Sequence, residues 1–442
     1  MRVQSSVDME TLRIDIKKLG SIENAQITLS PVMLFLGESG LGKSYVAMLC
    51  HYIYEFLLDS QRLNRFFEEQ NYDFNQMQHM WKDDAGVAIE IDQQELEEWL
   101  SKDDAIRYLR DMLNHEEFSA ILRIFLPPQK NGTFRIDYTA SLKGLVNKED
   151  LYYKLTLDDL SYNISATGQV GEESPFAFLL RHALIQKIFG SYDALRQAYI
   201  LPPARAVALT EQVYPLTGLY RRYQQWFRGL SYYPDLDERY EQLDATIANV
   251  IGGRIERKDG EFFYITSDDV EMPVSASAAS VRELGPLAFL IGKRDMGTTA
   301  LLFEEPEAHL HPLKQRKMAD VVARLKAVGT HMQITTHSDY FLRRVNELIM
   351  LGKLRETFES EHHEDTKRAF EQACQARGID PSCTFATQGF SAYYFCREDD
   401  GITRIVSETD FSSGISFKTF FDVLNEDVAN GERISNWLRE QA

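Results

Sequence analysis

The chain has 442 residues and a formal net charge of −19, from 67 acidic and 48 basic residues. This balance argues against a protein that binds nucleic acid over its whole surface, because such surfaces are rich in Lys and Arg. No apolar run reaches the roughly 18–20 residues that a membrane helix needs, and the N-terminal segment lacks the apolar core of a signal peptide. We therefore expect a cytoplasmic protein with no membrane partner.

The four cysteines show no C-x-x-C pairing, so the sequence predicts neither a zinc site nor a disulfide framework. Buried thiols in a reducing compartment are the preferred interpretation. Four histidines fall between residues 309 and 337, but H-x-H without cysteines or a suitable carboxylate context is a weak zinc signal.

The first elements lead to a glycine-rich loop. Residues 12–16 and 25–29 alternate apolar and polar side chains, as half-buried strands do. An unbroken apolar strand follows at 32–36, and a mostly apolar helix is predicted at 45–58. Between them, Gly37–Ser44 reads GESGLGKS and fits G-x-x-x-x-G-K-[ST], the phosphate-binding loop, or P-loop. A chance match is the alternative, and the strand and helix on either side argue against it.

The P-loop predicts nucleotide binding by its backbone and two side chains. The glycines let N–H groups turn toward phosphates, and the helix N-terminus adds partial positive charge. Lys43 is predicted to reach the β- and γ-phosphates, and the Ser44 hydroxyl to hold Mg²⁺. The predicted nucleotide contacts are Gly37, Glu38, Ser39, Gly40, Leu41, Gly42, Lys43, Ser44 and Tyr45.

The next part of the chain, residues 59–170, reads as an inserted subdomain. It begins with charged segments of helical spacing and ends with short alternating strands. The predicted helices are 62–70, 93–113 and 115–125, and the predicted strands are 133–138, 152–157 and 160–165. No motif in this part indicates chemistry.

Residues 171–350 return to a pattern of alternating helices and strands. The predicted helices are 175–190, with Ser174 as its cap, 211–230 and 235–251; a strand is predicted at 197–201 and a hairpin at 254–266. No helix sustains a heptad over several repeats, so long coiled-coil arms are not expected.

A second apolar strand, residues 298–303, leads directly into acidic residues. Acids at the end of such a strand complete a nucleotide site as a Walker B element does. Glu304 is predicted to coordinate Mg²⁺, and Glu305 to orient and polarise the attacking water. A strand that merely ends in a charged turn is the alternative.

Another short strand, residues 332–336, ends at His337. A neutral imidazole there is predicted to hydrogen-bond the γ-phosphate or the attacking water and to sense loss of the phosphate. Its position after the acids favours this role over a purely structural histidine.

The segments GESGLGKS, FEEPEAHLHP and ITTHSDYFL, in this order, resemble the ABC-type ATPases of the SMC-like and OLD-like group. The resemblance covers residues 11–58 and about 197–350. It implies an α/β fold: an ABC-type P-loop ATPase head with a mixed sheet flanked by helices, here with an inserted α+β subdomain. It also implies that two heads enclose ATP and Mg²⁺ between them.

Two further family segments are less regular here. Residues 199–205 look like the family's YIPAER segment, which implies that Arg205 contacts the nucleotide; a surface arginine is the alternative. Residues 275–283 match the signature region, which implies that Ser277 and Ser280 contact the partner's ATP. Ala278-Ala279-Ser280 replaces the usual Ser-Ser-Gly, and Ser280 with Glu283 also predicts a capping box. We therefore expect slow or partner-dependent hydrolysis.

The predicted domains are an N-terminal head part (1–58), the insertion (59–170), a C-terminal head part (171–350) and an α/β extension (351–442). OLD-like nucleases carry a TOPRIM nuclease domain after the ATPase, but the acids at 398–400 read instead as the turn of a hairpin. No nuclease is expected in this chain.

The expected function is an ATP-hydrolysing ATPase that forms a homodimer or higher homo-oligomer around ATP. Stand-alone relatives occur in bacterial phage-defence systems of the Septu and PARIS type. This resemblance implies that the protein senses infection and scaffolds or regulates a separate nuclease or toxin effector. The alternatives are an SMC-like DNA repair or recombination ATPase, for which nucleic acid is a possible partner, and a non-hydrolysing nucleotide-gated scaffold.

Overall fold

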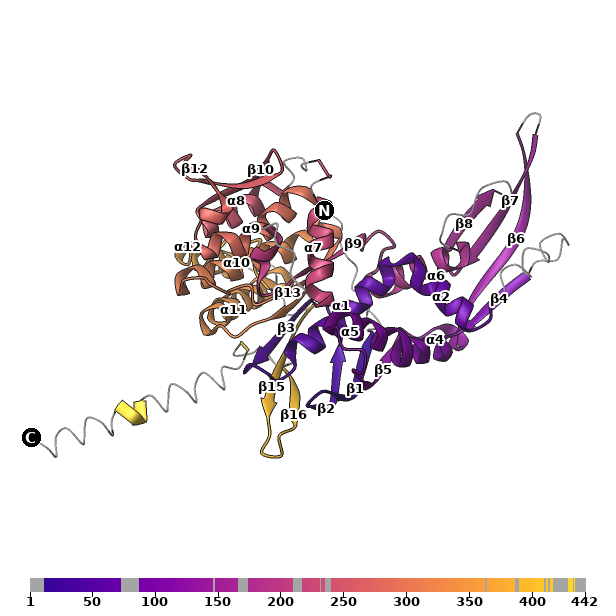
Figure 1. Cartoon of the computed structure of the whole chain (residues 1–442), viewed down its shortest axis with the longest axis horizontal. Coiled ribbons are helices and arrows are strands. Elements are labelled where there is room, and N and C mark those ends of the chain that lie inside the picture. The colour runs from indigo at the N-terminus through magenta and orange to yellow at the C-terminus, as the bar shows by residue number, and fades with distance from the viewer. Residues whose placement is uncertain are drawn as a thin grey trace, which may run out of the picture.

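A nine-stranded mixed sheet forms the centre of the computed structural model (Figure 1). The structure describes residues 12–72, 87–145, 148–165, 174–209, 217–230, 232–234, 240–361, 364–385, 389–408, 411, 414–415, 428–431 and 433. In spatial order the strands are β5 (Ala120–Phe125), β1 (Arg13–Leu19), β2 (Ile22–Thr28), β16 (Thr403–Glu408), β15 (Phe390–Arg397), β3 (Val32–Gly37), β14 (His331–Thr335), β13 (Thr299–Glu304) and β9 (Gln197–Leu201).

The five strands from β15 to β9 run parallel to one another, whereas β1 pairs antiparallel with β2 and β5. β3 is apolar along its length because both of its faces are covered. Met33 and Phe35 pack in one core with α1 (Lys43–Leu58), while Leu34 and Leu36 pack in the other.

The second core lies under a group of helices on the opposite face of the sheet. These helices are α7 (Gly218–Leu230), α8 (Glu241–Ile251), α9 (Ala279–Lys293), α10 (Pro312–Val328), α11 (Asp339–Glu361) and α12 (Glu364–Ala376). A small sheet of β10 (Gly253–Lys258), β11 (Glu261–Thr266) and β12 (Glu271–Pro273) lies beside them, and it confirms the predicted hairpin. The 3-10 turns of this part are η3 (Arg205–Leu209), η5 (Val274–Ala276) and η6 (Met296–Thr298).

The inserted part has its own four-stranded sheet, which extends away from the head in Figure 1. Its strands, in spatial order, are β4 (Val87–Asp92), β6 (Thr133–Leu145), β7 (Lys148–Leu157) and β8 (Leu160–Ser165). The helices and turns around it are α2 (Ser60–Glu69), α4 (Gln93–Trp99), the π-helix η1 (Leu100–Asp104), α5 (Ala105–Leu113), η2 (Lys130–Gly132) and α6 (Pro175–Phe189). The predicted α/β architecture, a mixed sheet flanked by helices with an inserted α+β subdomain, is confirmed.

The helix predicted at 115–125 is wrong, because these residues contain β5. Asn114 ends α5 in a left-handed conformation, and then Leu122 and Ile124 are buried while Ile121 and Arg123 are exposed. This alternation is the period of a strand. β5 therefore adds an edge strand to the head sheet from within the predicted insertion.

The strands β15 and β16 lie within the predicted extension at 351–442, yet they also belong to the head sheet. They form the hairpin predicted around residues 398–400. The head sheet thus draws strands from all four predicted domains.

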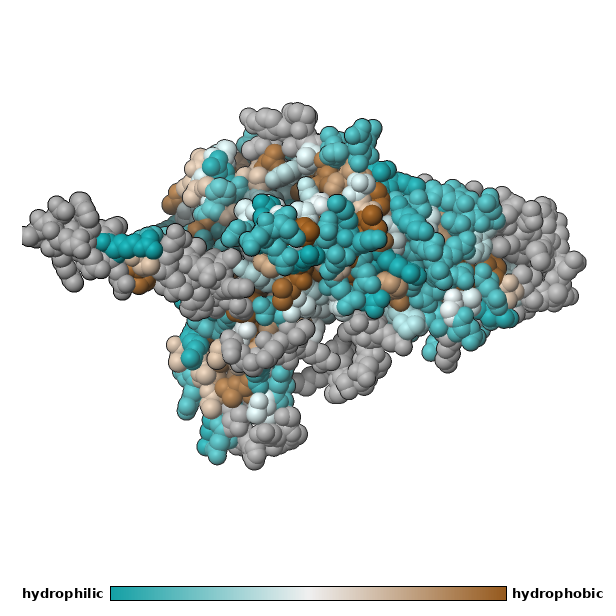
Figure 2. All heavy atoms as spheres, turned by 90° about the horizontal axis from the view of Figure 1, so that it is seen from below, coloured by the Kyte–Doolittle hydropathy of each residue, from teal (hydrophilic) through white to brown (hydrophobic). Residues whose placement is uncertain are grey.

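The surface seen from below is mainly hydrophilic over the inserted subdomain, and apolar side chains on the head occur in small groups (Figure 2). Among the described residues, no helix is both long and apolar enough to cross a membrane.

Candidate nucleotide-binding site

Three neighbouring parallel strands of the head sheet end at the predicted site. β14 lies between β3 and β13 and pairs with both. The P-loop follows β3, Glu304 ends β13, and His337 comes two residues after β14. Because the carboxyl ends of parallel strands meet at one edge of the sheet, the structure brings these three segments together.

The P-loop takes its shape from glycines in conformations that other residues rarely adopt. Gly37, Gly40 and Gly42 have φ values of 124°, 76° and 88°. A Cβ atom on Gly37 would lie 2.3 Å from the carbonyl oxygen of Phe395 on β15, so no side chain fits there. α1 begins directly after Gly42, and N–H groups at the start of a helix are able to bind phosphate.

The side chain of Lys43 folds back onto the P-loop and bonds to its backbone. Its Nζ donates to the carbonyl oxygens of Gly37 at 2.8 Å and Glu38 at 2.5 Å, and only 4% of the residue is exposed. Burial lowers the pKa of Lys43 to about 8, against the opposing effect of nearby carboxylates, chiefly Glu305. A phosphate oxygen is a stronger partner for this ammonium than a neutral carbonyl.

Ser44 and Glu304 form the predicted cation site. The Ser44 hydroxyl donates to the Glu304 carboxylate, which is 2% exposed at the end of β13. Burial raises the pKa of Glu304 to about 7, and its Oε1 has no hydrogen-bond partner among the described residues. An orphaned carboxylate oxygen beside a hydroxyl is a ligand set that suits Mg²⁺, so the residues present fit this ion.

Glu305 occupies a strained turn next to this pair. Its φ is 47°, and its N–H donates to the carbonyl oxygen of Thr335 at 3.0 Å. Its Oε1 lies 3.5 Å from Nε2 of His337, which itself lies 3.5 Å from Oγ of Ser39. The predicted water-activating residue, the histidine and the P-loop are thus adjacent.

The surroundings of His337 favour its neutral form by lowering its pKa. Burial, and then the positive charge of Lys43, lower its pKa below the ordinary value of a histidine. A neutral imidazole can both donate and accept a hydrogen bond. This is the property that the predicted γ-phosphate sensor needs.

Glu307 is a member of the site that motif reasoning did not single out. It is 6% exposed, and its Oε1 accepts hydrogen bonds from Oγ1 of Thr336 at 2.6 Å and from N of His337 at 2.9 Å. Burial raises its pKa. Glu307 therefore ties the acidic turn to the end of β14 and fixes the backbone of His337. Its position in the segment EEPEAH, shortly after the two predicted acids, is the sequence signal that could have identified it.

The structure places Arg205 behind the acids instead of in contact with a nucleotide. The residue is completely buried, and its guanidinium donates to the backbone carbonyls of Glu283, Glu304 and Glu305. The alternative of a surface arginine is also excluded by this burial. The ring of Tyr45 packs against that of Phe118, 5.8 Å away between centroids, and the contact of Tyr45 with a nucleotide stays a prediction.

The capping box predicted for Ser280 and Glu283 is wrong. α9 begins at Ala279, Ala278 occupies the cap position, and no side chain caps the helix. The Glu283 carboxylate instead accepts hydrogen bonds from the backbone N–H groups of residues 205 and 206. Ser277 donates to the carbonyl oxygen of Val274 at 2.7 Å. The segment before α9 is mostly exposed, and the contact of Ser277 and Ser280 with a partner's ATP stays a prediction.

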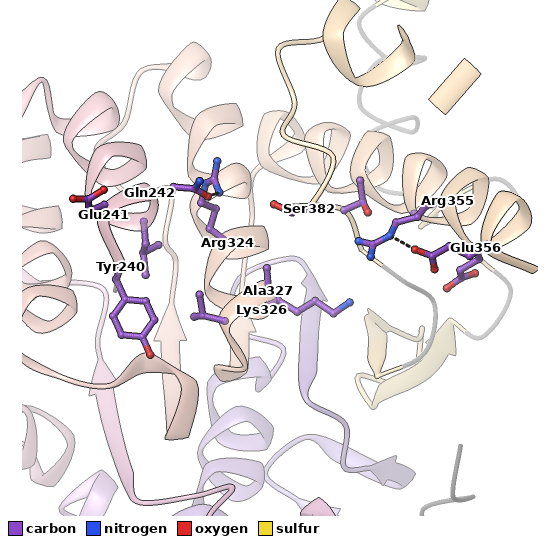
Figure 3. A pocket seen from close by; sticks show the side chains of 14 residues that line it. Tyr240, Glu241, Gln242, Arg324, Lys326, Ala327, Arg355, Glu356 and Ser382 are labelled. Atoms are coloured by element: carbon purple, nitrogen blue, oxygen red, sulfur yellow. Dashed lines mark hydrogen bonds and ion pairs between the residues drawn. The ribbon is translucent and has the colours of Figure 1, made fainter. Parts of the chain in front are cut away.

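A separate cavity of about 870 Å³ lies between α8, α10 and α11 (Figure 3). Its walls carry both signs of charge, including Arg324, Lys326, Arg355 and Glu356. Arg324 is bonded to Asp380 at 2.9 Å, and Arg355 is paired with Glu359. The cavity contains none of the predicted site residues, which lie instead at the strand ends.

Residues 228–342 match the family model of an AAA ATPase domain. The chain is similar to AAA ATPases in this segment. The match contains the start of α9, the acidic residues after β13 and His337, whereas the P-loop lies before it. No curated protein gives a match to the chain.

Solved structures similar to this ATPase-like chain include SMC head domains. The SMC head domain from Thermotoga maritima is 10% identical with a TM-score of 0.35, covering 90% of this chain and 98% of that one. An Smc head bound to the C-winged helix domain of ScpA is 12% identical with a TM-score of 0.36, covering 93% and 99%. An Smc head with an extended coiled coil, bound to the C-terminal domain of ScpA derived from Pyrococcus furiosus, is 11% identical with a TM-score of 0.34, covering 94% and 98%.

Proposed function

We propose that this protein binds ATP with Mg²⁺ and hydrolyses it. The observation that carries the proposal is the meeting of the P-loop residues Lys43 and Ser44 with Glu304, Glu305 and His337 at the ends of three adjacent strands. These residue types supply what phosphoryl transfer to water needs: charge neutralisation, an oriented nucleophile and a group that contacts the γ-phosphate.

Each side chain has a distinct role in this proposal. Lys43 exchanges its carbonyl partners for phosphate oxygens, and Ser44 with Glu304 would hold Mg²⁺, which would supply positive charge to neutralise the phosphates. Glu305 accepts a hydrogen bond from the attacking water and orients its oxygen toward the γ-phosphorus. The water oxygen forms a bond to the γ-phosphorus while the bond between this phosphorus and the bridging oxygen breaks. The water gives up a proton to Glu305, and ADP and inorganic phosphate leave. His337, near Glu305, hydrogen-bonds the γ-phosphate.

We further propose that a second copy of the chain completes the site. The exposed segment before α9, which corresponds to the signature region, is available to a partner's nucleotide. The resemblance to defence ATPases supports a role in sensing infection and regulating a separate nuclease or toxin. Loss of phage protection by Lys43→Ala, in cells that carry the neighbouring genes, tests this role.

The biochemical test compares wild type with Lys43→Ala and Glu305→Gln. Lys43→Ala is expected to lose ATP binding, because the P-loop then lacks its phosphate cation. Glu305→Gln is expected to bind ATP, to lose turnover and to accumulate as a dimer, measured by calorimetry, phosphate release and size-exclusion chromatography. Glu359→Gln, a change at an exposed ion pair, is the matched control.

Wild-type turnover by Glu305→Gln would refute the assignment of the water-activating residue. ATP binding without phosphate release by the wild-type protein would establish the non-hydrolysing scaffold instead.

A further inference from the structure

The most deeply buried cation of the site is Arg205, which no step of the proposed reaction uses. It is 0% exposed, and its guanidinium lies over the ring of Phe303 at 5.4 Å. Placing such a charge in the interior is costly unless its N–H groups are bonded. The hydrogen bonds of Arg205 therefore indicate which parts of the structure it connects.

On one side, Arg205 is fixed to α9. Its Nε donates to the carbonyl oxygen of Glu283 at 2.8 Å, and its backbone N–H donates to the Glu283 carboxylate at 2.6 Å. The same carboxylate accepts from N–H of Ala206 at 3.1 Å. Side chain and backbone thus bind η3 to the first turns of α9, close to the exposed segment that starts this helix.

On the other side, Arg205 holds the backbone of the acidic turn. Nη1 donates to the carbonyl oxygen of Glu304 at 2.8 Å, and Nη1 and Nη2 lie 3.4 and 3.3 Å from that of Glu305. The planar guanidinium can bond in several fixed directions at once, which a lysine cannot.

The backbone that Arg205 holds is strained. Glu305 has a φ of 47°, a conformation that persists in a residue with a side chain only when its surroundings enforce it. Its N–H is bonded to β14 and its carbonyl to Arg205. The direction of the Glu305 side chain, which starts from this backbone, therefore depends on Arg205.

We propose that Arg205 is a positioning residue that links the start of α9 to the water-orienting carboxylate of Glu305. A displacement at the start of α9, for example on contact with a second copy, reaches Glu305 through the side chain of Arg205. In this proposal Arg205 acts through the backbone of Glu305 and not by contact with the nucleotide. The proposal rests on the proposed function, because it assigns Glu305 a part in hydrolysis.

The test uses Arg205→Met, which keeps much of the side-chain volume and removes every donor, and Arg205→Lys. ATP turnover by Arg205→Met is expected to fall roughly 10- to 100-fold, the effect of misplacing a reacting group by about 1 Å. Arg205→Lys is expected to recover only part of the loss. The Kd for a non-hydrolysable ATP analogue with Mg²⁺ is expected to stay within about threefold of wild type.

A double-mutant cycle with Glu305→Gln separates positioning from a general structural role. If Arg205 acts through Glu305, Arg205→Met adds less than about threefold to the loss in Glu305→Gln. Full multiplication of the two losses would overturn the proposal, and so would a large rise in the Kd, which would indicate direct nucleotide contact.

Glu283→Gln is also combined with Glu305→Gln in a double-mutant cycle. If Arg205→Met does not fold, this second cycle tests the link between α9 and Glu305. It keeps the length of the side chain but weakens its bonds to residues 205 and 206. Unchanged ATP turnover in a folded Arg205 variant refutes the link between α9 and Glu305 but not the proposed ATPase function. If no Arg205 variant folds, unchanged turnover in Glu283→Gln has the same meaning. A wild-type protein that does not hydrolyse ATP refutes the proposed function and the link with it.

Discussion

Replacing Gly37 by Ala tests how the P-loop is packed. Gly37 has a φ of 124°, and a Cβ atom would lie 2.3 Å from the carbonyl oxygen of Phe395, its partner in the β3–β15 ladder. The backbone conformation costs about 1–3 kcal/mol for a residue with a side chain. Relieving the contact requires β3 and β15 to separate locally, at about 1 kcal/mol for each lost hydrogen bond. We expect Gly37→Ala to lower the free energy of unfolding by about 3–5 kcal/mol.

Gly40→Ala is the matched control for this change. Gly40 also has a positive φ, 76°, but a Cβ atom there meets nothing within 4 Å. We expect a loss of only about 1–2 kcal/mol, from backbone strain alone. Urea unfolding without nucleotide, followed by circular dichroism, measures both variants. Equal losses within about 0.5 kcal/mol would refute the argument that β15 limits the shape of the loop.

Two further predictions concern stability away from the P-loop. Asp104→Asn is expected to cost about 3–5 kcal/mol in urea unfolding, because Asp104 is buried and paired with Arg62 at 2.7 Å. The exposed pair at Glu90 provides the control, and Glu90→Gln is expected to cost less than about 1 kcal/mol; a similar loss in both would contradict the burial argument. Burial lowers the pKa of His331 from 6.5 to about 4, so its contribution to stability is lost as pH falls from about 6.5 to 4, where only the unfolded chain takes up the proton. The acid loss is expected to be smaller in His331→Phe but not in the exposed control His115→Gln, and an unchanged pH profile of stability in His331→Phe would count against it.

The P-loop and the acidic strand end could be predicted because each is a short contiguous pattern flanked by a strand of recognisable length. Their meeting at one edge of the sheet then follows from the geometry of parallel strands. The same reasoning predicted that His337 lies at this edge, and the structure puts its ring beside Ser39 and Glu305.

The rest of the site depends on contacts between segments far apart in the sequence. The pattern around Arg205 cannot show whether its side chain faces a nucleotide or the interior, since that depends on α9 and β13. The left-handed backbone of Glu305 is likewise set by its neighbours in space. The prediction of a helix where the edge strand β5 lies was wrong for a related reason, because β5 is defined by its pairing with β1 and not by any motif of its own.

The place of β15 beside β3 has a consequence for the order of events during synthesis. β3 emerges from the ribosome early, but its two neighbours in the sheet, β14 and β15, are translated much later, after the inserted subdomain and most of the head. The carbonyl of Phe395 that lies against Gly37 is among the last parts of the head to be translated. A nascent chain that ends before β15 therefore lacks the strand that packs against Gly37, and the P-loop can reach its native packing only after β15 has been translated.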